Sequence, residues 1–246
     1  MQENIVYPHV SVDCVILGFD GMHFNVLLLK RTGTEGNACF NDLKLPGSLI
    51  YADEDLDTAA HRILGELFTS TSFFIQQFKS FGSLDRTSNP RDIQWLEKAL
   101  QLKIGRIVTV SYLSLIRIDD KLRFKSDIVQ TTWVPVQEVK ELAFDHKTIL
   151  LEAMDEVRRY MAIDPSLVFT LLPKKFTAAQ MRTLFEELFA RPMDVRNFHK
   201  KMNHMEYVVP LDEYEKGVSH RAARYYRFDK KIFQKFHGGF QYNQTV

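Results

Sequence analysis

The sequence contains two cysteines and no long hydrophobic run. Cys14 lies in an apolar, strand-like stretch and Cys39 in a polar one, which suggests free thiols in a reducing compartment. No His and Cys residues have the spacing of a structural zinc site. No apolar run approaches the roughly 20 residues that span a bilayer, and the first ten residues lack the order of a signal peptide. We therefore expect a cytoplasmic protein that does not contact a membrane.

Charge is distributed unevenly along the chain. Residues 1–165 carry 18 Lys and Arg against 23 Asp and Glu, a net charge of −5. Residues 166–246 carry 14 against 8, a net charge of +6. A basic C-terminal third suggests a polyanionic partner. Chance clustering of charges on a solvated surface is the alternative.

Strand and helix patterns alternate before residue 164, which indicates an α/β domain. Residues 10–19 and 24–31 predict two strands, residues 32–42 a loop, and residues 73–81 a further strand. Asp57 is expected to cap a helix that ends near Leu67. Residues 106–118 and 122–134 predict a hairpin, and residues 145–163 predict a long amphipathic helix.

The dipeptide Asp164-Pro165 ends this helix, because proline disfavours helical geometry in the residue before it. We expect one domain at 1–164 and a second at 165–246. In the second, Thr177 and Gln180 form a capping-box pattern, and Asp194 is expected to cap another helix that runs to about residue 205. Residues 207–210 and 225–228 resemble two short strands. Helix, turn, helix and β-ribbon is the order of a winged helix.

The segment from Gly47 to residue 69 resembles the Nudix box, whose pattern is Gly-x5-Glu-x7-Arg-Glu-U-x-Glu-Glu-x-Gly-U, with U aliphatic. The resemblance implies an α/β/α sandwich with a mixed sheet. In active members, glutamates of the box hold divalent cations for diphosphate hydrolysis. In this chain Gly47 matches, and Asp53 takes the first glutamate position. Five later positions of the pattern are occupied by His61, Arg62, Gly65, Glu66 and Phe68.

The departures from this pattern argue against catalysis. Arg62 would repel Mg²⁺ where a ligand is needed, and Gly65 offers no side-chain oxygen. Glu66 alone remains of the three helix glutamates. We therefore expect no catalytic residues, no metal site and no cofactor.

A second segment is similar to Nudix proteins of the ADP-ribose type. There, an Asp-Arg-x-Pro-Arg turn leads into an Arg-Val-Val-Ser-type strand. Here the turn contains Arg86 and Arg91, and the insertion Asp92–Gly105 separates it from the strand at residues 106–112. We expect Lys44, Arg86 and Arg91 to bind an effector. The alternative is that both arginines are surface residues of a loop.

The C-terminal segments at residues 171–177, 193–202 and 217–228 resemble the tail of the Nudix-related transcriptional regulators. That family joins a degenerate Nudix domain to a winged helix, and the resemblance covers nearly the whole chain. It implies double-stranded operator DNA as a partner, a homodimer, and an effector that is a nucleotide sugar such as ADP-ribose, a sugar or a sugar phosphate.

The second helix of this tail has an apolar and a basic side. Val195, Phe198 and Met202 are expected to pack inward. Polar residues of the helix and of the following wing are expected to contact DNA: Arg196, Asn197, His199, Lys200, Lys201, Lys216, His220, Arg221 and Arg224. A solvated basic helix is the alternative.

Two functions from different classes follow. The first is a ligand-responsive, DNA-binding transcriptional regulator with an inactive Nudix domain. The second is an active Nudix hydrolase of ADP-ribose-like diphosphates with relocated metal ligands. In this alternative, the C-terminal tail only mediates association. An RNA-binding Nudix protein is disfavoured by the order of elements in the tail.

Overall fold

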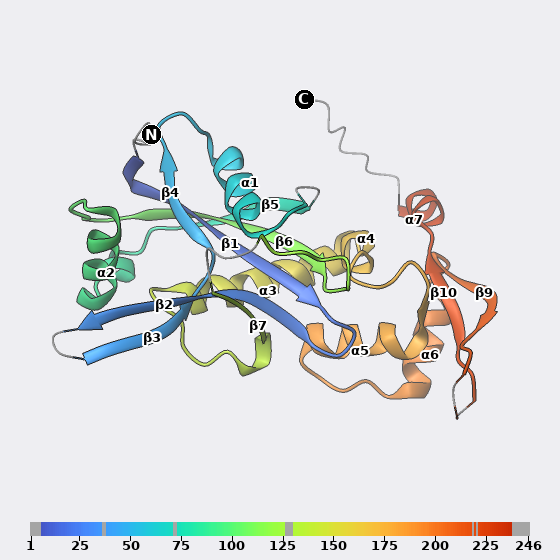
Figure 1. Cartoon of the computed structure of the whole chain (residues 1–246). Coiled ribbons are helices and arrows are strands. Elements are labelled where there is room, and N and C mark those ends of the chain that lie inside the picture. The colour runs from blue at the N-terminus through green and yellow to red at the C-terminus, as the bar shows by residue number, and fades with distance from the viewer. Residues whose placement is uncertain are drawn as a thin grey trace.

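The computed structural model describes residues 6–35, 38–70, 73–125, 130–217, 219 and 221–237. The chain forms two adjoining parts (Figure 1). The first is built on a seven-stranded mixed sheet, and the second on a three-stranded sheet with helices beside it. None of the helices in the described part of the chain combines the length and apolar character that crossing a membrane requires.

Strand β1 (Val6–Phe19) lies at the centre of the large sheet. It pairs in parallel with β6 (Val108–Arg117), in register from the pair Val10 and Val108 to the pair Phe19 and Arg117. Five more strands complete the sheet: β2 (Phe24–Glu35), β3 (Ala38–Lys44), β4 (Gly47–Tyr51), β5 (Phe74–Phe81) and β7 (Thr131–Pro135).

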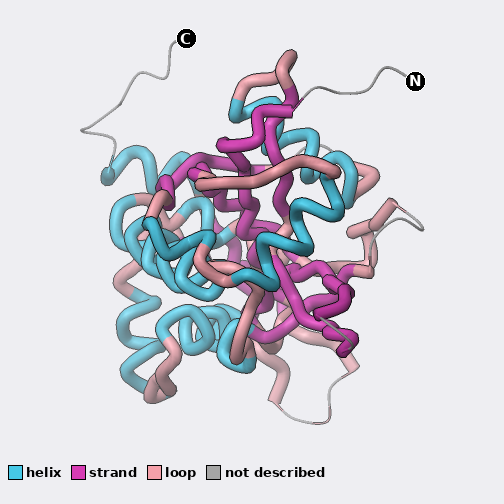
Figure 2. The backbone as a smooth tube through the Cα atoms, turned by 90° about the vertical axis from the view of Figure 1, so that its left-hand side faces the viewer, coloured by secondary structure: helices cyan, strands magenta, loops and turns pink. Residues whose placement is uncertain are grey.

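Side chains of β1 alternate between two apolar layers, because successive residues of a strand point to opposite faces. Val15 and Leu17 belong to the layer that contains α3 (His146–Ile163), whereas Cys14 and Ile16 belong to the layer that contains α1 (Leu56–Leu67). Helices therefore cover both faces of the sheet, and the strands run between them (Figure 2). This is the predicted α/β/α sandwich.

Two shorter helical elements belong to this part. η1 (Leu84–Thr87) follows β5, and η2 (Val136–Glu138) lies between β7 and α3. A full helix, α2 (Pro90–Leu100), lies between η1 and β6. It occupies most of the segment that the sequence identified as an insertion.

The predicted loop at residues 32–42 is wrong. β2 continues to Glu35, and β3 pairs with it in antiparallel register from Leu29 and Lys44 to Glu35 and Ala38. The polar composition of β3 hid this strand from the sequence pattern. Its ladder is supported by an ion pair between Arg31 and Asp42 with an N–O distance of 2.6 Å.

The predicted hairpin at residues 106–134 is also wrong. β6 already has β1 on one side and β5 on the other, so neither of its edges is open to β7. β7 instead pairs with β2, where Trp133 lies opposite Leu27.

The N-cap of α1 is Asp55 rather than the expected Asp57. The Asp55 side chain accepts a hydrogen bond from the Thr58 N–H at 2.7 Å, whereas Asp57 lies in the first turn and accepts from the Tyr112 hydroxyl.

The second part has the element order of a winged helix. Its elements are α4 (Ser166–Phe169), β8 (Phe176–Thr177), α5 (Ala178–Phe189), α6 (Val195–Asn203), β9 (Val208–Tyr214), β10 (Arg224–Phe228) and α7 (Lys230–His237). The capping box of Thr177 and Gln180 and the Asp194 cap are both confirmed. Helix α7 was not expected from the sequence.

Val195 does not pack inward as expected, since it is 49% exposed. It lies in the first turn of α6, before the position at which that helix meets α5. The contact between the helices is made by Phe198 against Phe185, with ring centroids 5.8 Å apart.

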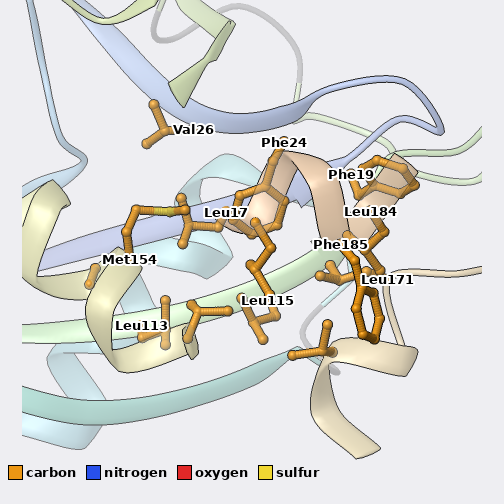
Figure 3. Packing of buried hydrophobic residues seen from close by; sticks show 14 of the residues in the cluster. Leu17, Phe19, Phe24, Val26, Leu113, Leu115, Met154, Leu171, Leu184 and Phe185 are labelled. Carbon is orange, nitrogen blue, oxygen red and sulfur yellow. The ribbon is translucent and has the colours of Figure 1, made fainter. Parts of the chain in front are cut away.

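One apolar core continues from the first part into the second. Leu17, Phe19 and Phe24 of the large sheet belong to the same buried cluster as Leu171, Leu184 and Phe185 (Figure 3). Helix α3 ends at Ile163, next to the expected domain boundary. That boundary remains a prediction, and apolar side chains from both sides of it pack together.

Candidate functional site

Arg62 of α1 is enclosed by carboxylates. Its Nε and Nη2 donate to Glu54 at 2.9 and 2.6 Å, and its Nη1 donates to Glu66 Oε1 at 3.1 Å. The hydrogen bonds from Arg62 hold the pKa of the Glu54 carboxyl below its usual value. The guanidinium carbon also lies 4.0 Å from the centre of the Tyr51 ring. The cation that the sequence placed at a metal-ligand position is thus bonded to the two nearby carboxylates.

Glu54 was missed by the comparison with the Nudix pattern, which assigned the first glutamate position to Asp53. Asp53 is exposed, and Glu54, one residue later, reaches α1. Gly65 faces open space, because a Cβ there would meet no atom within 4 Å. Among the described residues, no group of three or more His, Cys, Asp or Glu side chains is arranged to hold a metal ion.

A cavity of about 180 Å³ lies between the large sheet, α2 and the start of α3. Its polar lining comes mainly from Ser11, Asp13, Lys44, Arg86 and His146. Arg86 Nη1 donates to both carboxylate oxygens of Asp145 at 2.6 and 2.8 Å, and its Nη2 donates to Asp13 Oδ2 at 2.9 Å. The buried guanidinium therefore links β1 to the start of α3.

Gly47, which opens the Nudix-like segment, allows the backbone to pass close to this lining. A Cβ at this position would lie 2.1 Å from Asp13 Oδ1. The glycine that matches the Nudix pattern is required here by a close approach between β4 and β1.

His146 is a neutral member of the lining. The Leu45 N–H donates to His146 Nδ1 at 2.9 Å, so that nitrogen carries no proton. Burial lowers the pKa of His146 to about 4, against the opposing effect of Asp13, whose Oδ1 lies 3.6 Å from Nε2. At neutral pH the imidazole is therefore uncharged.

Asp13 and Lys44 are charged residues of the cavity lining that act on this imidazole. Burial alone would raise the pKa of Asp13, but its cationic surroundings hold that pKa below the usual value. Since His146 is neutral, we attribute this effect to Arg86. Burial lowers the pKa of Lys44, whose Nζ donates to the carbonyl oxygens of Leu45 and Gly47 at 3.1 and 3.4 Å.

Helix α2 supplies the apolar wall of the cavity. Trp95, Leu96, Ala99 and Leu100 line it from this helix. The insertion that the sequence placed beside the expected pocket is therefore part of the pocket itself.

Arg31 holds α2 in place, and sequence reasoning missed it. Its side chain is fully buried and forms ion pairs with Asp42 and Asp92, each with an N–O distance of 2.6 Å. Its guanidinium also lies 5.2 Å from the Trp95 ring centre and 5.1 Å from that of Phe144. A single arginine at the end of an apolar strand was the available signal.

Of the three expected effector residues, Lys44 and Arg86 line the cavity and Arg91 does not. Arg91 instead donates to Asp42 Oδ2 at 3.2 Å, and its guanidinium carbon lies 5.0 Å from the centre of the Phe40 ring. It supports the β2–β3 hairpin beside the pocket.

The basic side of α6 is open to solvent. Phe198 and Met202 are buried, whereas Arg196, Asn197, His199, Lys200 and Lys201 are exposed. In the described part of the chain, none of these five side chains has a hydrogen bond or ion pair to another residue. The helix is fixed from behind by the Phe185–Phe198 contact and at its start by the Asp194 cap.

The wing between β9 and β10 contains the remaining residues that were expected to contact DNA, and their surroundings differ. Lys216 and Arg221 are exposed, and Gly217 has a φ of 72°, in the region that favours glycine. Arg224 Nε already donates to the Leu211 carbonyl at 2.6 Å. His220 lies outside the described residues.

Comparisons with known proteins agree with both parts of the fold. Residues 168–228 match the family described as the NrtR DNA-binding winged helix domain. The crystal structure of Shewanella oneidensis NrtR complexed with a 27mer DNA has a TM-score of 0.62 and 20% identity, over 89% of this chain and 93% of that chain. A search of curated proteins finds no match.

A second solved structure supports the Nudix-like part as well. A MutT/nudix family protein from Enterococcus faecalis has a TM-score of 0.60 and 24% identity, over 93% of this chain and 89% of that chain. The predicted combination of a Nudix-like domain and a winged helix is therefore confirmed. Residues 168–228 thus match the NrtR DNA-binding winged helix domain, and the chain as a whole has a two-part fold similar to that of the Shewanella oneidensis NrtR structure.

Proposed function

We propose that the protein is a ligand-responsive, DNA-binding transcriptional regulator that acts as a homodimer in the cytoplasm. The observation that carries this proposal is α6, a helix with an exposed, unpaired basic side within an NrtR-type winged helix. A helix of this kind fits the major groove, where Arg recognises guanine and Asn recognises adenine. The Shewanella relative was crystallised with DNA.

The cavity beside α2 is the proposed effector site. Ligand pockets are concave and mostly apolar, with a few polar groups that fix orientation, and this cavity has that composition. The sequence resemblance suggests a nucleotide sugar, a sugar or a sugar phosphate as the effector. Lys44 and Arg86 are the proposed contacts from the original three residues.

The last turn of α5 offers a physical route from this site to DNA. The Phe24 N–H at the start of β2 donates to Glu187 Oε2 at 3.0 Å, and Arg158 Nε of α3 donates to the Leu188 carbonyl at 3.0 Å. The neighbouring Glu186 accepts from the Met193 N–H at 2.8 Å, in the turn that leads into α6. Helix α3 also begins at the pocket, with His146. A shift of α3 or of the start of β2 would therefore reach the base of the recognition helix.

Hydrolysis is the second candidate function, and we propose that the protein lacks it. Arg62 bonds the carboxylates of Glu54 and Glu66, and Gly65 contributes no ligand. A strongly hydrated dication needs several free oxygen ligands in near-octahedral geometry.

Two experiments test these proposals. Duplexes selected by the protein from a random library should share a sequence and bind more tightly than unselected duplexes. Failure to enrich any sequence would contradict the proposed function as a transcriptional regulator. Incubation of ADP-ribose and related diphosphates with Mg²⁺ should release no product. Turnover that disappears in Glu66→Gln would instead favour the hydrolase.

A further inference from the structure

We infer that the guanidinium of Arg62 takes the place of a divalent cation in this fold, as a permanent internal cation that fixes β4 to α1. The resemblance to the Nudix box implies a metal site at α1, and the residues present do not fit one. Arg62 stands where the pattern has a metal-ligand glutamate, and its charged group occupies the surrounding oxygen atoms. This goes beyond the proposed function, because it concerns the stability of the first part and not DNA binding.

Five oxygen atoms accept hydrogen bonds from Arg62, and together they are called the oxygen cage below. Nε donates to Glu54 Oε2 at 2.9 Å, and Nη1 donates to Glu66 Oε1 at 3.1 Å. Nη2 donates to Glu54 Oε1 at 2.6 Å, to Ser48 Oγ at 3.0 Å and to the Leu49 carbonyl oxygen at 3.3 Å. Carboxylate and carbonyl oxygens are ligands that hard divalent cations take in proteins. The oxygen cage therefore has the chemistry of a cation site, and a guanidinium fills it.

The oxygen cage joins two elements of the first part. Ser48 and Leu49 belong to β4 and Glu54 to the loop that follows, whereas Arg62 and Glu66 belong to α1. Ser48 and Leu49 also line the cavity beside α2. Arg62 is therefore a positioning residue, because it fixes one wall of the proposed effector site to α1.

The oxygen cage needs a cation because one of its carboxylates is buried. The Glu54 side chain is 6% exposed, whereas the Glu66 side chain is 58% exposed and is hydrated as well. Burying an unpaired carboxylate is strongly unfavourable. The guanidinium of Arg62 is always charged and covalently attached, whereas a metal ion stabilises a fold only according to its free concentration. The native fold should therefore be independent of divalent cations.

Shortening Arg62 should convert the oxygen cage into a metal site. In Arg62→Ala, the carboxylates of Glu54 and Glu66 and the Leu49 carbonyl would face the volume that the guanidinium fills in the native chain. Mn²⁺ accepts carboxylate, carbonyl and water ligands, so water can complete its coordination. In the native chain, the positive charge of Arg62 repels a metal ion from the same oxygen atoms.

Titration of the full chain with MnCl₂ tests the inference. Electron paramagnetic resonance measures the bound Mn²⁺, and thermal denaturation in Mn²⁺ or in EDTA measures its effect on stability. The native chain should melt at the same temperature in both. Arg62→Ala should bind Mn²⁺ at least about tenfold more tightly than the native chain does. At about ten times its Kd, Mn²⁺ should raise the melting temperature of this variant by about 3–6 °C.

The experiment also covers a variant that does not fold without metal. If Arg62→Ala is unfolded in EDTA, refolding in Mn²⁺ should recover the folded chain. Failure to fold in either solution would overturn the inference.

Two further variants connect the bound Mn²⁺ to the oxygen cage. Arg62→Ala combined with Glu54→Gln removes the buried carboxylate but keeps its shape, and it should lose the response to Mn²⁺. Lys98→Ala is the matched control for the lost positive charge, because Lys98 is an exposed residue of α2. Its melting temperature should be the same in Mn²⁺ and in EDTA, as for the native chain.

Three results would overturn the inference without touching the proposed function. The first is stabilisation of the native chain by Mn²⁺. The second is a folded Arg62→Ala chain that binds Mn²⁺ no more tightly than the native chain. The third is equal binding of Mn²⁺ with and without Glu54→Gln, which would assign the ion to other oxygen atoms. The selection of a duplex tests the proposed function separately, since none of these measurements involves DNA.

Discussion

Helices α1 and α6 both carry cationic side chains, but the two helices use them in opposite ways. In α1, Arg62 is largely buried and bonds Glu54 and Glu66. In α6, Arg196, Lys200 and Lys201 extend into solvent with no acidic partner in the described part of the chain. The first cation is satisfied within the fold, and the other three are left for a partner outside it.

This difference shows why residue type alone does not assign a function. A cation enclosed by carboxylates is neutralised by them within the fold. A cluster of unpaired cations on one helix face has a potential that attracts polyanions and releases counterions when DNA binds. Pairing within the fold, rather than the number of charges, distinguishes the two helices.

Removing the unpaired cations of α6 should have the largest effect. The triple variant Arg196→Ala, Lys200→Ala, Lys201→Ala is expected to bind the selected duplex at least about 100-fold more weakly. Each lost phosphate contact should lower the salt slope by about 0.9, and a lost base contact should cost about 1–3 kcal/mol. Affinities across a salt series measure both quantities.

The control for this variant removes the same charge elsewhere. Lys98, Lys103 and Lys125 are exposed residues of the first part. Their triple alanine variant should bind DNA almost as well as the native chain. Equal losses in both triple variants would mean that total charge, and not the α6 surface, determines binding.

Removing the paired cation of α1 should affect stability instead of DNA binding. Arg62→Ala leaves Glu54, whose side chain is 6% exposed, without its partner. Breaking a buried pair in this way is expected to cost about 3 kcal/mol of unfolding free energy, measured by urea denaturation. Glu66→Gln is the matched control, because the Glu66 side chain is 58% exposed and its loss should cost less than about 1 kcal/mol.

Acidification should lower the free energy of unfolding through His146, a buried residue of the pocket. The pKa of His146 is about 4 in the folded chain, below its ordinary value of 6.5, so the unfolded chain binds this proton first. Stability from this group is complete above pH 6.5 and falls as the pH decreases from 6.5 to 4, by up to about 3 kcal/mol. The charged groups around it are Asp13, Lys44, Arg86 and Arg31.

The variant His146→Asn isolates this contribution, because an amide oxygen can still accept the Leu45 N–H. Its unfolding free energy should vary less between pH 6.5 and 4 than that of the native chain. Identical pH profiles would show that His146 is not buried as a neutral imidazole.

The smallest expected effect lies in the wing. Lys216→Ala should lower the salt slope of DNA binding by about 0.9 if this exposed lysine meets one phosphate. Arg224→Ala should change the slope less, because Arg224 Nε is already bonded to the Leu211 carbonyl. The reverse order of effects would assign the phosphate contact to Arg224.

Local sequence signals predicted those parts of the fold that local interactions determine. Thr177 and Gln180 gave the start of α5, and Asp194 gave the start of α6, because capping bonds join residues three apart. The predicted pairing of residues 122–134 with residues 106–118 was wrong, because strand pairing depends on which edges of the sheet are already occupied.

The candidate site was predicted in part for the same reason. Lys44 and Arg86 were found through a family pattern that lies within short segments. Arg31 and Asp92 were missed because they are 61 residues apart in sequence and meet through β2 and α2. The hydroxyl of Ser11, which has no hydrogen-bond partner among the described residues, could not be found either, since its burial depends on the whole sheet.

The continuous core of the two parts has a consequence for how such a chain can be divided or recombined. Leu171, Leu184 and Phe185 would become solvent-exposed if the chain were cut after Asp164, and Phe19 and Phe24 would be uncovered on the other fragment. Each fragment would then expose an apolar surface, and such a surface favours aggregation. The winged helix therefore cannot be joined unchanged to another ligand-binding domain. A functional chimera would have to exchange the facing residues of the large sheet together with it.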